Sequence, residues 1–297
     1  MMKKILLLVG LLLTYQSWAQ EETTALHTVS GNTIQHEFEV GVQTYLLADK
    51  VNVRTRPSSK ATISVNLPIG TPITILRKSK DKLYLNGFRA FWYEVSFAAT
   101  KGISKGYVWG GLIALGNLSG AGQEDVLFLY GIASVSTKKE EGYERQVVKM
   151  QVRACKNEKE ASKVTFPSVG NLRHAYHTFS NYGNRGVHTI VDVLEYEESQ
   201  EFCGGENPTT VLFWDGEKLH KVTTLYAVSD PPVFAFKTIT YPNENGGIPY
   251  RLIVEEKEGW YEEETEKEVL EVHKKIACVW IKDELEEFKV LLDKKRE

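Results

Sequence analysis

The feature that most constrains the fold of this chain is a dense series of short apolar, β-branched or aromatic runs, each followed by a turn signal. Six such runs lie in the first half of the sequence, at 44–47, 51–53, 63–67, 73–76, 91–97 and 107–109. Turn-forming residues such as Arg56-Pro57-Ser58 and Asn86-Gly87 separate them. Closely spaced strands without a helical period predict an all-β chain, with a small barrel in this region.

The composition agrees with a chain that buries a real core. Of 297 residues, 42% are hydrophobic and 25% are charged, which excludes wholesale disorder. At roughly 100–200 residues per domain, this length predicts about two domains.

The N-terminus has the pattern of an export signal. Lys3 and Lys4 precede an apolar run at 5–13, and Ser17-Trp18-Ala19 follows with small residues at a cleavage site. A run this short does not span a bilayer core of ~30 Å, so an uncleaved anchor is the weaker alternative. We expect a signal peptide at 1–19, cleavage after Ala19, and a periplasmic or secreted protein. No second run is long enough for a transmembrane segment, and residues 20–43 form a polar N-terminal arm.

Charge is distributed unevenly along the chain. The segment 45–116 carries 11 basic and three acidic residues, whereas 255–297 carries 15 acidic and nine basic residues. A basic module beside an acidic one predicts an anionic partner for the first or attraction between the two, and simple solvated faces are the remaining alternative. Nucleic acid is not expected as a partner, because the chain is predicted to leave the cytoplasm.

Four motifs between residues 44 and 116 carry a family resemblance. They are VNVRTRPS at 51–58, LPIGT at 67–71, WYEV at 92–95 and GYVW at 106–109. Together, and in this order, they resemble the bacterial SH3-like domains, over about a quarter of the chain. The resemblance implies a small barrel that recognises cell-wall peptides or acts as a scaffold, and it does not imply catalysis.

Two departures from the family pattern affect the expected binding groove. Arg56 replaces the glycine of the first loop, and the segments 81–90 and 98–105 are expected to lengthen the loops beside the Trp92 strand.

The candidate ligand-binding residues follow from these motifs. In a strand over 91–95, Tyr93 and Val95 point to one face and Trp92 to the other, so one set fills the barrel and the other lines a groove or covers a barrel end. An aromatic groove with guanidinium groups at its rim suits peptides that bear carboxylates. The alternative is plain core packing for the aromatic residues and solvated surface positions for the arginines. The candidates are Asn52, Arg54, Arg56, Trp92, Tyr93, Tyr107 and Trp109.

The larger part, residues 122–297, also reads as β-rich. Apolar runs at 126–130, 147–152, 189–194, 210–214, 233–239 and 252–254 alternate with turn signals such as Asp215-Gly216. A weak internal repeat of about 60 residues aligns Trp214 with Trp280 and the 184–187 segment with 245–248. Such a repeat predicts duplicated sheets, as in a small propeller, a sandwich or an open meander. Residues 283–295 are expected to form either a strand or a short amphipathic helix.

The three cysteines lie in a compartment that favours oxidation. Cys155 and Cys203 sit near turn residues and are the expected disulfide pair, while Cys278 lies in an apolar run and is expected to be a buried thiol. No spacing matches a zinc site, so neither a metal nor a cofactor is predicted.

No catalytic constellation is apparent in the sequence. The leading hypothesis is an exported, non-enzymatic cell-envelope protein that binds peptidoglycan peptides or an envelope protein. The alternative is a cell-wall hydrolase or amidase with a site around His174, His177 and Cys203. In a third hypothesis, the barrel is purely structural and docks on the acidic domain.

Overall fold

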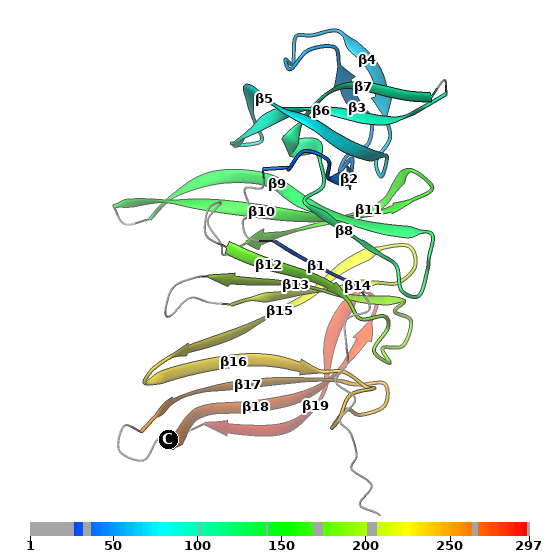
Figure 1. Cartoon of the computed structure of the whole chain (residues 1–297). Helices are drawn as coiled ribbons and strands as arrows, with labels where there is room; N and C mark the ends of the chain where they lie inside the picture. Colours follow the sequence, from blue (N-terminus) through cyan, green and yellow to red (C-terminus); the bar gives the residue numbers. More distant parts are fainter. Residues whose placement is uncertain are drawn as a thin grey trace, which may run out of the picture.

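The computed structural model describes residues 27–31, 37–100, 102–140, 142–168, 175–200, 207–262 and 267–295. These residues form an all-β structure in which a curled half-barrel sits on a stack of antiparallel sheets (Figure 1). The one helical element among them is a short 3₁₀ turn, Gly110–Leu112. Within these ranges no helix reaches the length and apolarity needed to cross a membrane. The predicted signal peptide lies outside the described residues.

The half-barrel is a six-stranded sheet with the order β2-β5-β6-β7-β3-β4. Its strands are β2 (Gln43–Tyr45), β3 (Val51–Arg54), β4 (Ile63–Leu67), β5 (Pro72–Leu85), β6 (Phe88–Ala99) and β7 (Gly102–Trp109). Alternate residues of the central strands, among them Val53, Tyr93, Val95 and Val108, fill its interior.

Two segments expected as lengthened loops are strands instead. Residues 81–90 continue the β5–β6 hairpin as far as a two-residue turn at Asn86-Gly87, and much of 98–105 belongs to the β6–β7 hairpin. Leu83, Phe88 and Ala90 of the first segment pack against the core beneath the half-barrel. The strand pairing shows that both segments are hairpin arms and not loops.

Three consecutive four-stranded meanders follow the half-barrel. The first consists of β8 (Gly116–Ser119), β9 (Val126–Glu140), β10 (Tyr143–Lys156) and β11 (Lys159–Ser168). The second consists of β12 (Ala175–Asn181), β13 (Asp192–Gln200), β14 (Thr209–Trp214) and β15 (Leu219–Asp230). The third consists of β16 (Val233–Thr240), β17 (Leu252–Tyr261), β18 (Glu268–Ile281) and β19 (Glu284–Lys295).

The second and third meanders belong to one nine-stranded sheet, because β15 changes partner along its length. Its first half pairs with β14 and its second half, from Tyr226 onward, pairs with β16. The strand β1 (His27–Gly31), from the N-terminal arm, extends this sheet by pairing with β12. The arm therefore contributes to the sheet stack before it leads into the half-barrel.

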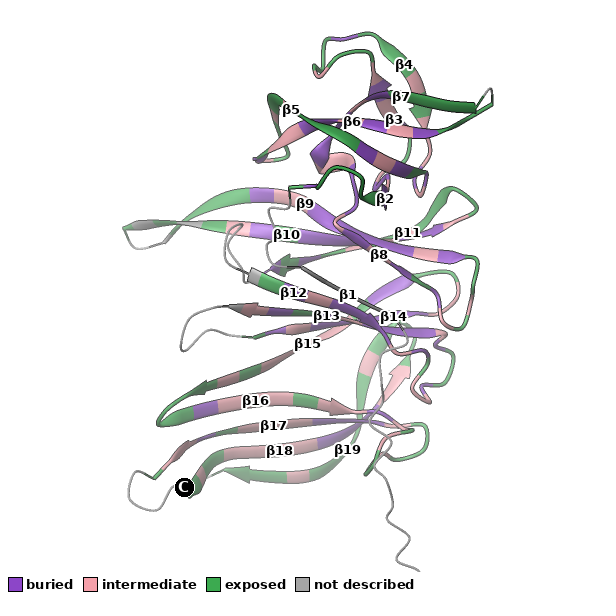
Figure 2. Cartoon of the chain, viewed as in Figure 1, coloured by how far each residue is buried: buried purple, intermediate pink, exposed green. Residues whose placement is uncertain are grey.

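The middle strands of the second meander, β13 and β14, are buried on both of their faces. Leu194 and Leu212 pack against the first meander, whereas Val193 and Val211 pack against the third. This double burial explains the continuous apolar run at 210–214, since strands covered on both sides lose the apolar–polar alternation. Figure 2 shows buried residues along β8, β9, β10 and β14, where the first two meanders face each other.

The half-barrel docks on the first meander through apolar side chains. Trp92 and Trp109 share one core with Phe128 and Met150 of the meander. On the other side of the contact, Leu47 of the half-barrel packs in a small cluster with meander residues. The half-barrel therefore docks through a hydrophobic contact on the first meander, whereas the acidic strands β17–β19 lie at the far end of the stack (Figure 1).

The expectation of a helix at 283–295 is wrong, because β19 pairs with β18 along this segment. Two β-bulges insert Phe288 and Leu291 into β19 as extra residues. In a regular strand, side chains on one face repeat every two residues, and each extra residue displaces this repeat by one position. Leu285, Phe288 and Leu292 are three and four residues apart, which is also the spacing of one helix face.

The two segments aligned by the internal repeat occupy equivalent places. Trp214 ends β14 before a hairpin turn, and Trp280 lies near the end of β18 before another. The aligned loops at 184–187 and 245–248 precede β13 and β17. They also lie together, because the Asn243 backbone N–H donates a hydrogen bond to the Arg185 carbonyl oxygen at 3.3 Å.

Candidate functional site

The outer face of the half-barrel carries a row of charged and aromatic side chains. Arg77 of β5 pairs with Glu94 of β6, Glu94 pairs with Tyr107 of β7, and Tyr107 pairs with Arg54 of β3. Residues directly opposite in antiparallel strands project from the same face. We call Arg54, Arg77, Glu94, Lys105 and Tyr107 the cationic face.

A β-bulge brings Arg77 to this face. Val95 pairs with Ile75, but the next residue of β6, Glu94, pairs with Arg77, so one extra residue lies in β5. Ile75 points into the half-barrel core. Arg77 lies two positions after Ile75, so in a regular strand its side chain would also point into the core. The extra residue turns the Arg77 side chain to the outer face instead.

Hydrogen bonds and ion pairs order the cationic face. The Arg77 Nη2 donates to Tyr107 Oη at 2.6 Å and lies 3.1 Å from Glu94 Oε2. Lys105 Nζ lies 3.8 Å from Glu94 Oε1. The hydrogen bond to Tyr107, together with the nearby charge of Glu94, raises the pKa of Arg77 above its ordinary value. Glu94 therefore pairs with two of the three cations on this face.

The structure separates the predicted ligand-binding residues into buried and accessible groups. Tyr93 lies inside the half-barrel, and Trp92 and Trp109 lie between the half-barrel and the first meander, each less than 5% exposed. These three aromatic side chains are core residues, and Tyr93 also lines a hollow together with Phe38 and Phe88.

The other predicted residues lie at or near the surface. Arg54 and Tyr107 are half-buried members of the cationic face, and Arg56 is exposed in the following loop. Arg54 Nη1 donates to the Ala61 carbonyl oxygen at 2.6 Å, which holds that loop. Asn52 accepts a hydrogen bond from the Asn66 side chain on β4. Arg77 and Lys105 were not among the predicted site residues, because their place in the row depends on the bulge and on the strand register.

The positive charge of the half-barrel is not neutralised by the sheets beneath it. Among the described residues, the ion pairs of its lysines and arginines reach only Glu94 and, from the N-terminal arm, Glu37. The contact with the first meander is made by apolar side chains instead. The cationic face thus keeps a surplus of charge toward solvent.

The residues of the hydrolase alternative do not form a visible catalytic group. His177 is 4% exposed in the core between the first and second meanders, where its Nε2 lies 2.6 Å from Tyr130 Oη. His174 and Cys203 lie outside the described residues. The hydrolase alternative therefore stays a prediction without added support.

The cysteines behave as buried thiols where the structure describes them. Cys155 and Cys278 are both free and buried, and burial raises the pKa of each thiol. The Cys155 Sγ donates a weak hydrogen bond to the Ile69 carbonyl oxygen at 3.6 Å, beneath the half-barrel. Because Cys203 lies outside the described residues, its predicted pairing with Cys155 stays a prediction.

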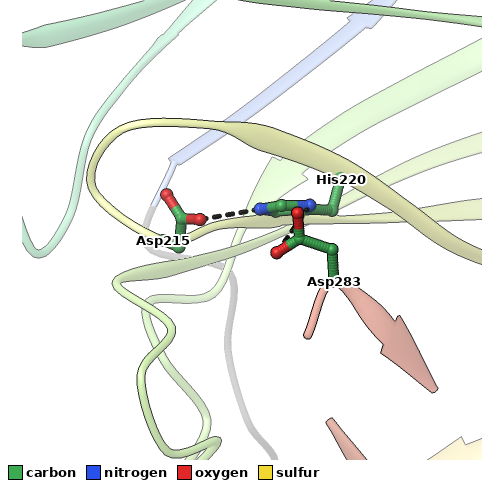
Figure 3. A group of neighbouring side chains, drawn as sticks. All are labelled: Asp215, His220 and Asp283. Carbon is green, nitrogen blue, oxygen red and sulfur yellow. Dashed lines mark hydrogen bonds and ion pairs between the residues drawn. The ribbon is translucent and has the colours of Figure 1, made fainter. Parts of the chain in front are cut away.

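A second polar cluster lies at the turns of two hairpins in the nine-stranded sheet (Figure 3). Asp215 is in the β14–β15 turn, His220 is near the start of β15, and Asp283 is in the β18–β19 turn. Each offers one metal-ligand atom, and these atoms lie within 4.8 Å of one another. His220 is buried, and its ring packs edge-on against Trp280 with the centroids 5.4 Å apart.

Sequence reasoning missed this cluster because Asp283 lies 63 residues after His220 and the three residues match no metal motif. The internal repeat was the available signal, since it aligns the residues just before both turns. Only the pairing of the strands brings the two turns together.

Comparison of the chain with protein-family models, with curated proteins and with solved structures finds no match in any of the three.

Proposed function

We propose that this chain is an exported, non-enzymatic cell-envelope protein that binds carboxylate-bearing peptides, such as those of peptidoglycan, on the cationic face of its half-barrel. The observation that carries the proposal is the surplus of cations on that face. Arg77 and Lys105 share the carboxylate of Glu94 there, and Arg54 adds a third cation to the row. Among the described residues, no ion pair from outside the half-barrel reaches these three cations.

The arrangement suits a ligand with carboxylates better than a simple counter-ion. Arg77 is ordered by Tyr107 and Glu94 while its side chain stays 64% exposed, so its guanidinium is held in place yet reachable. A guanidinium binds a carboxylate through two parallel hydrogen bonds. The extended backbone of a peptide would lie along the row and meet several of these groups in turn.

The apolar docking of the half-barrel also supports a binding role. Because Trp92 and Trp109 fix the half-barrel on the first meander, the cationic face is carried by a rigid support. Rigid presentation lowers the entropy that binding costs.

The test is co-sedimentation of the protein, starting at Gln20, with purified peptidoglycan sacculi across a salt series. The variant Arg77→Gln/Lys105→Gln removes both cations that pair with Glu94. The control Lys149→Gln/Lys221→Gln removes the same charge from exposed positions on β10 and β15. Charged hydrogen bonds contribute about 1.5–3 kcal/mol each, so we expect the first variant to bind at least tenfold more weakly.

Several outcomes decide the proposal. Binding that weakens with salt and needs Arg77 and Lys105 supports it. Equal loss in the control variant would indicate a general charge effect and contradict the assignment to this face. No binding of the unmodified protein at low salt would reject peptidoglycan as the ligand, and release of soluble wall fragments would reject the non-enzymatic assignment.

A further inference from the structure

We propose that the turns of the β14–β15 and β18–β19 hairpins form a Zn²⁺ site. In this site His220 Nδ1 and Asp283 Oδ1 bind the ion, and Asp215 orients the imidazole. The proposal is independent of the peptide-binding function, because the site lies in the nine-stranded sheet and not on the half-barrel.

The first step is the orientation of the imidazole. Asp215 Oδ2 lies 2.7 Å from His220 Nε2. Asp215 Oδ1 accepts hydrogen bonds from the Glu217 and Lys218 backbone N–H groups, which hold its carboxylate in the turn. Because Nε2 faces Asp215, Nδ1 is the ring nitrogen available to bind an ion.

The second step is the surroundings of Nδ1. The His220 side chain is only 4% exposed, yet within the described ranges its Nδ1 makes no hydrogen bond. The nearest carboxylate atom, Asp283 Oδ1, lies 3.6 Å away, which is too long for a hydrogen bond. Nδ1 of the buried imidazole and the Asp283 carboxylate thus face each other across a gap.

The third step is the size of that gap. Zinc binds imidazole nitrogen at about 2.0–2.1 Å and carboxylate oxygen at about 2.0–2.2 Å. Two ligand atoms 3.6 Å apart would then subtend an angle of roughly 120° at the ion, close to tetrahedral. The hydrogen bond of Asp215 to the other ring nitrogen supplies the outer partner that metal-binding histidines usually have.

The fourth step is the space for further ligands. Asp215 and Asp283 line an open hollow together with Thr189, Glu217, Trp280 and Lys282. Two coordination positions therefore remain for water, the Glu217 carboxylate or an external anion. A mixed imidazole and carboxylate set favours zinc over Mg²⁺, which prefers oxygen ligands alone.

Two neighbouring cations oppose the ion. Lys282 lines the hollow. Lys218 Nζ lies 2.6 Å from Asp283 Oδ2, the carboxylate oxygen that the proposal leaves free. Its charge holds Asp283 in position but repels a metal ion nearby. Replacing Lys218 by Gln should therefore tighten zinc binding, a result that a merely structural cluster would not give.

The experiment is titration of EDTA-stripped full-length protein with ZnCl₂, followed by calorimetry and by thermal unfolding, with MgCl₂ for comparison. We expect one zinc ion to bind and to raise the Tm, because a ligand specific for the folded state stabilises it. Binding should be lost in Asp283→Asn and His220→Gln, should weaken about 10–100-fold in Asp215→Asn, and should be unchanged in the control Asp230→Asn.

The outcomes remain decisive even if the buried His220 is needed for folding. The Asp283 side chain is 50% exposed, so Asp283→Asn leaves the core untouched. No zinc binding by the unmodified protein would overturn the proposal. Binding that persists unchanged in Asp283→Asn would also overturn it, since the ion would then lie elsewhere.

Discussion

Replacing Gly87 by Ala should detach the tip of the β5–β6 hairpin from the first meander. Gly87 follows Asn86 in the two-residue turn and has a φ of +83°. A Cβ atom at this position would lie 1.7 Å from the carbonyl oxygen of Val135. Because that oxygen belongs to the backbone of β9, no side-chain rotation relieves the overlap, and the hairpin must move away.

The magnitude follows from what the movement disrupts. A left-handed conformation costs a residue with a Cβ about 1–2 kcal/mol. The Val135 N–H donates to the Asn86 carbonyl oxygen at 2.9 Å, and loss of this bond costs about 1 kcal/mol. Partial exposure of Phe88, which packs against Trp109, costs up to about 1.5–3 kcal/mol. The expected loss in the free energy of unfolding is therefore roughly 3–6 kcal/mol.

The assay is urea unfolding followed by tryptophan fluorescence, with Gly246→Ala as the matched control. Gly246 has a similar φ of +79°, but a Cβ there meets no atom within 4 Å. The control therefore carries the backbone cost alone, about 1–2 kcal/mol. If the two variants lose the same stability, the hairpin tip does not fix the half-barrel on the meander, and the reasoning fails.

Three further predictions concern buried charge and buried thiols. Arg185→Met should lower the free energy of unfolding by about 3–5 kcal/mol in urea, because it leaves Glu195 and Glu244 buried without their shared cation; a loss below 1 kcal/mol would contradict this. The lowered pKa of Asp215 means that its stabilising effect is present above its ordinary pKa of 3.8 and disappears as the pH falls through its folded-state pKa. The stability difference between the unmodified chain and Asp215→Asn in urea should accordingly shrink in acid, and a constant difference would refute the assignment. In a variant without the other two cysteines, Cys155 should react slowly with a thiol reagent in the native state and rapidly in urea, because it is buried with a raised pKa; equal rates would show that it is accessible.

The cationic face illustrates how far sequence reasoning reached. Arg54 and Tyr107 were identified from motifs, and the structure places them opposite each other on β3 and β7. Trp92 was recognised as projecting away from Tyr93, but whether it lined a groove or a packing contact depended on what lay above it. The first meander covers it. Arg77 escaped prediction because a bulge, which depends on the partner strand, reverses its direction.

Local patterns in the sequence therefore determined the all-β class, most strand positions and the equivalence of two hairpins. These properties depend on turn residues and on side-chain alternation within a few neighbouring positions. Only the tertiary structure decided which strands share a sheet, which aromatic side chains are covered, and that Asp215 and His220 meet Asp283. Strand pairing and layer stacking bring together residues that are far apart in the chain, and short sequence patterns do not specify which of these residues come into contact.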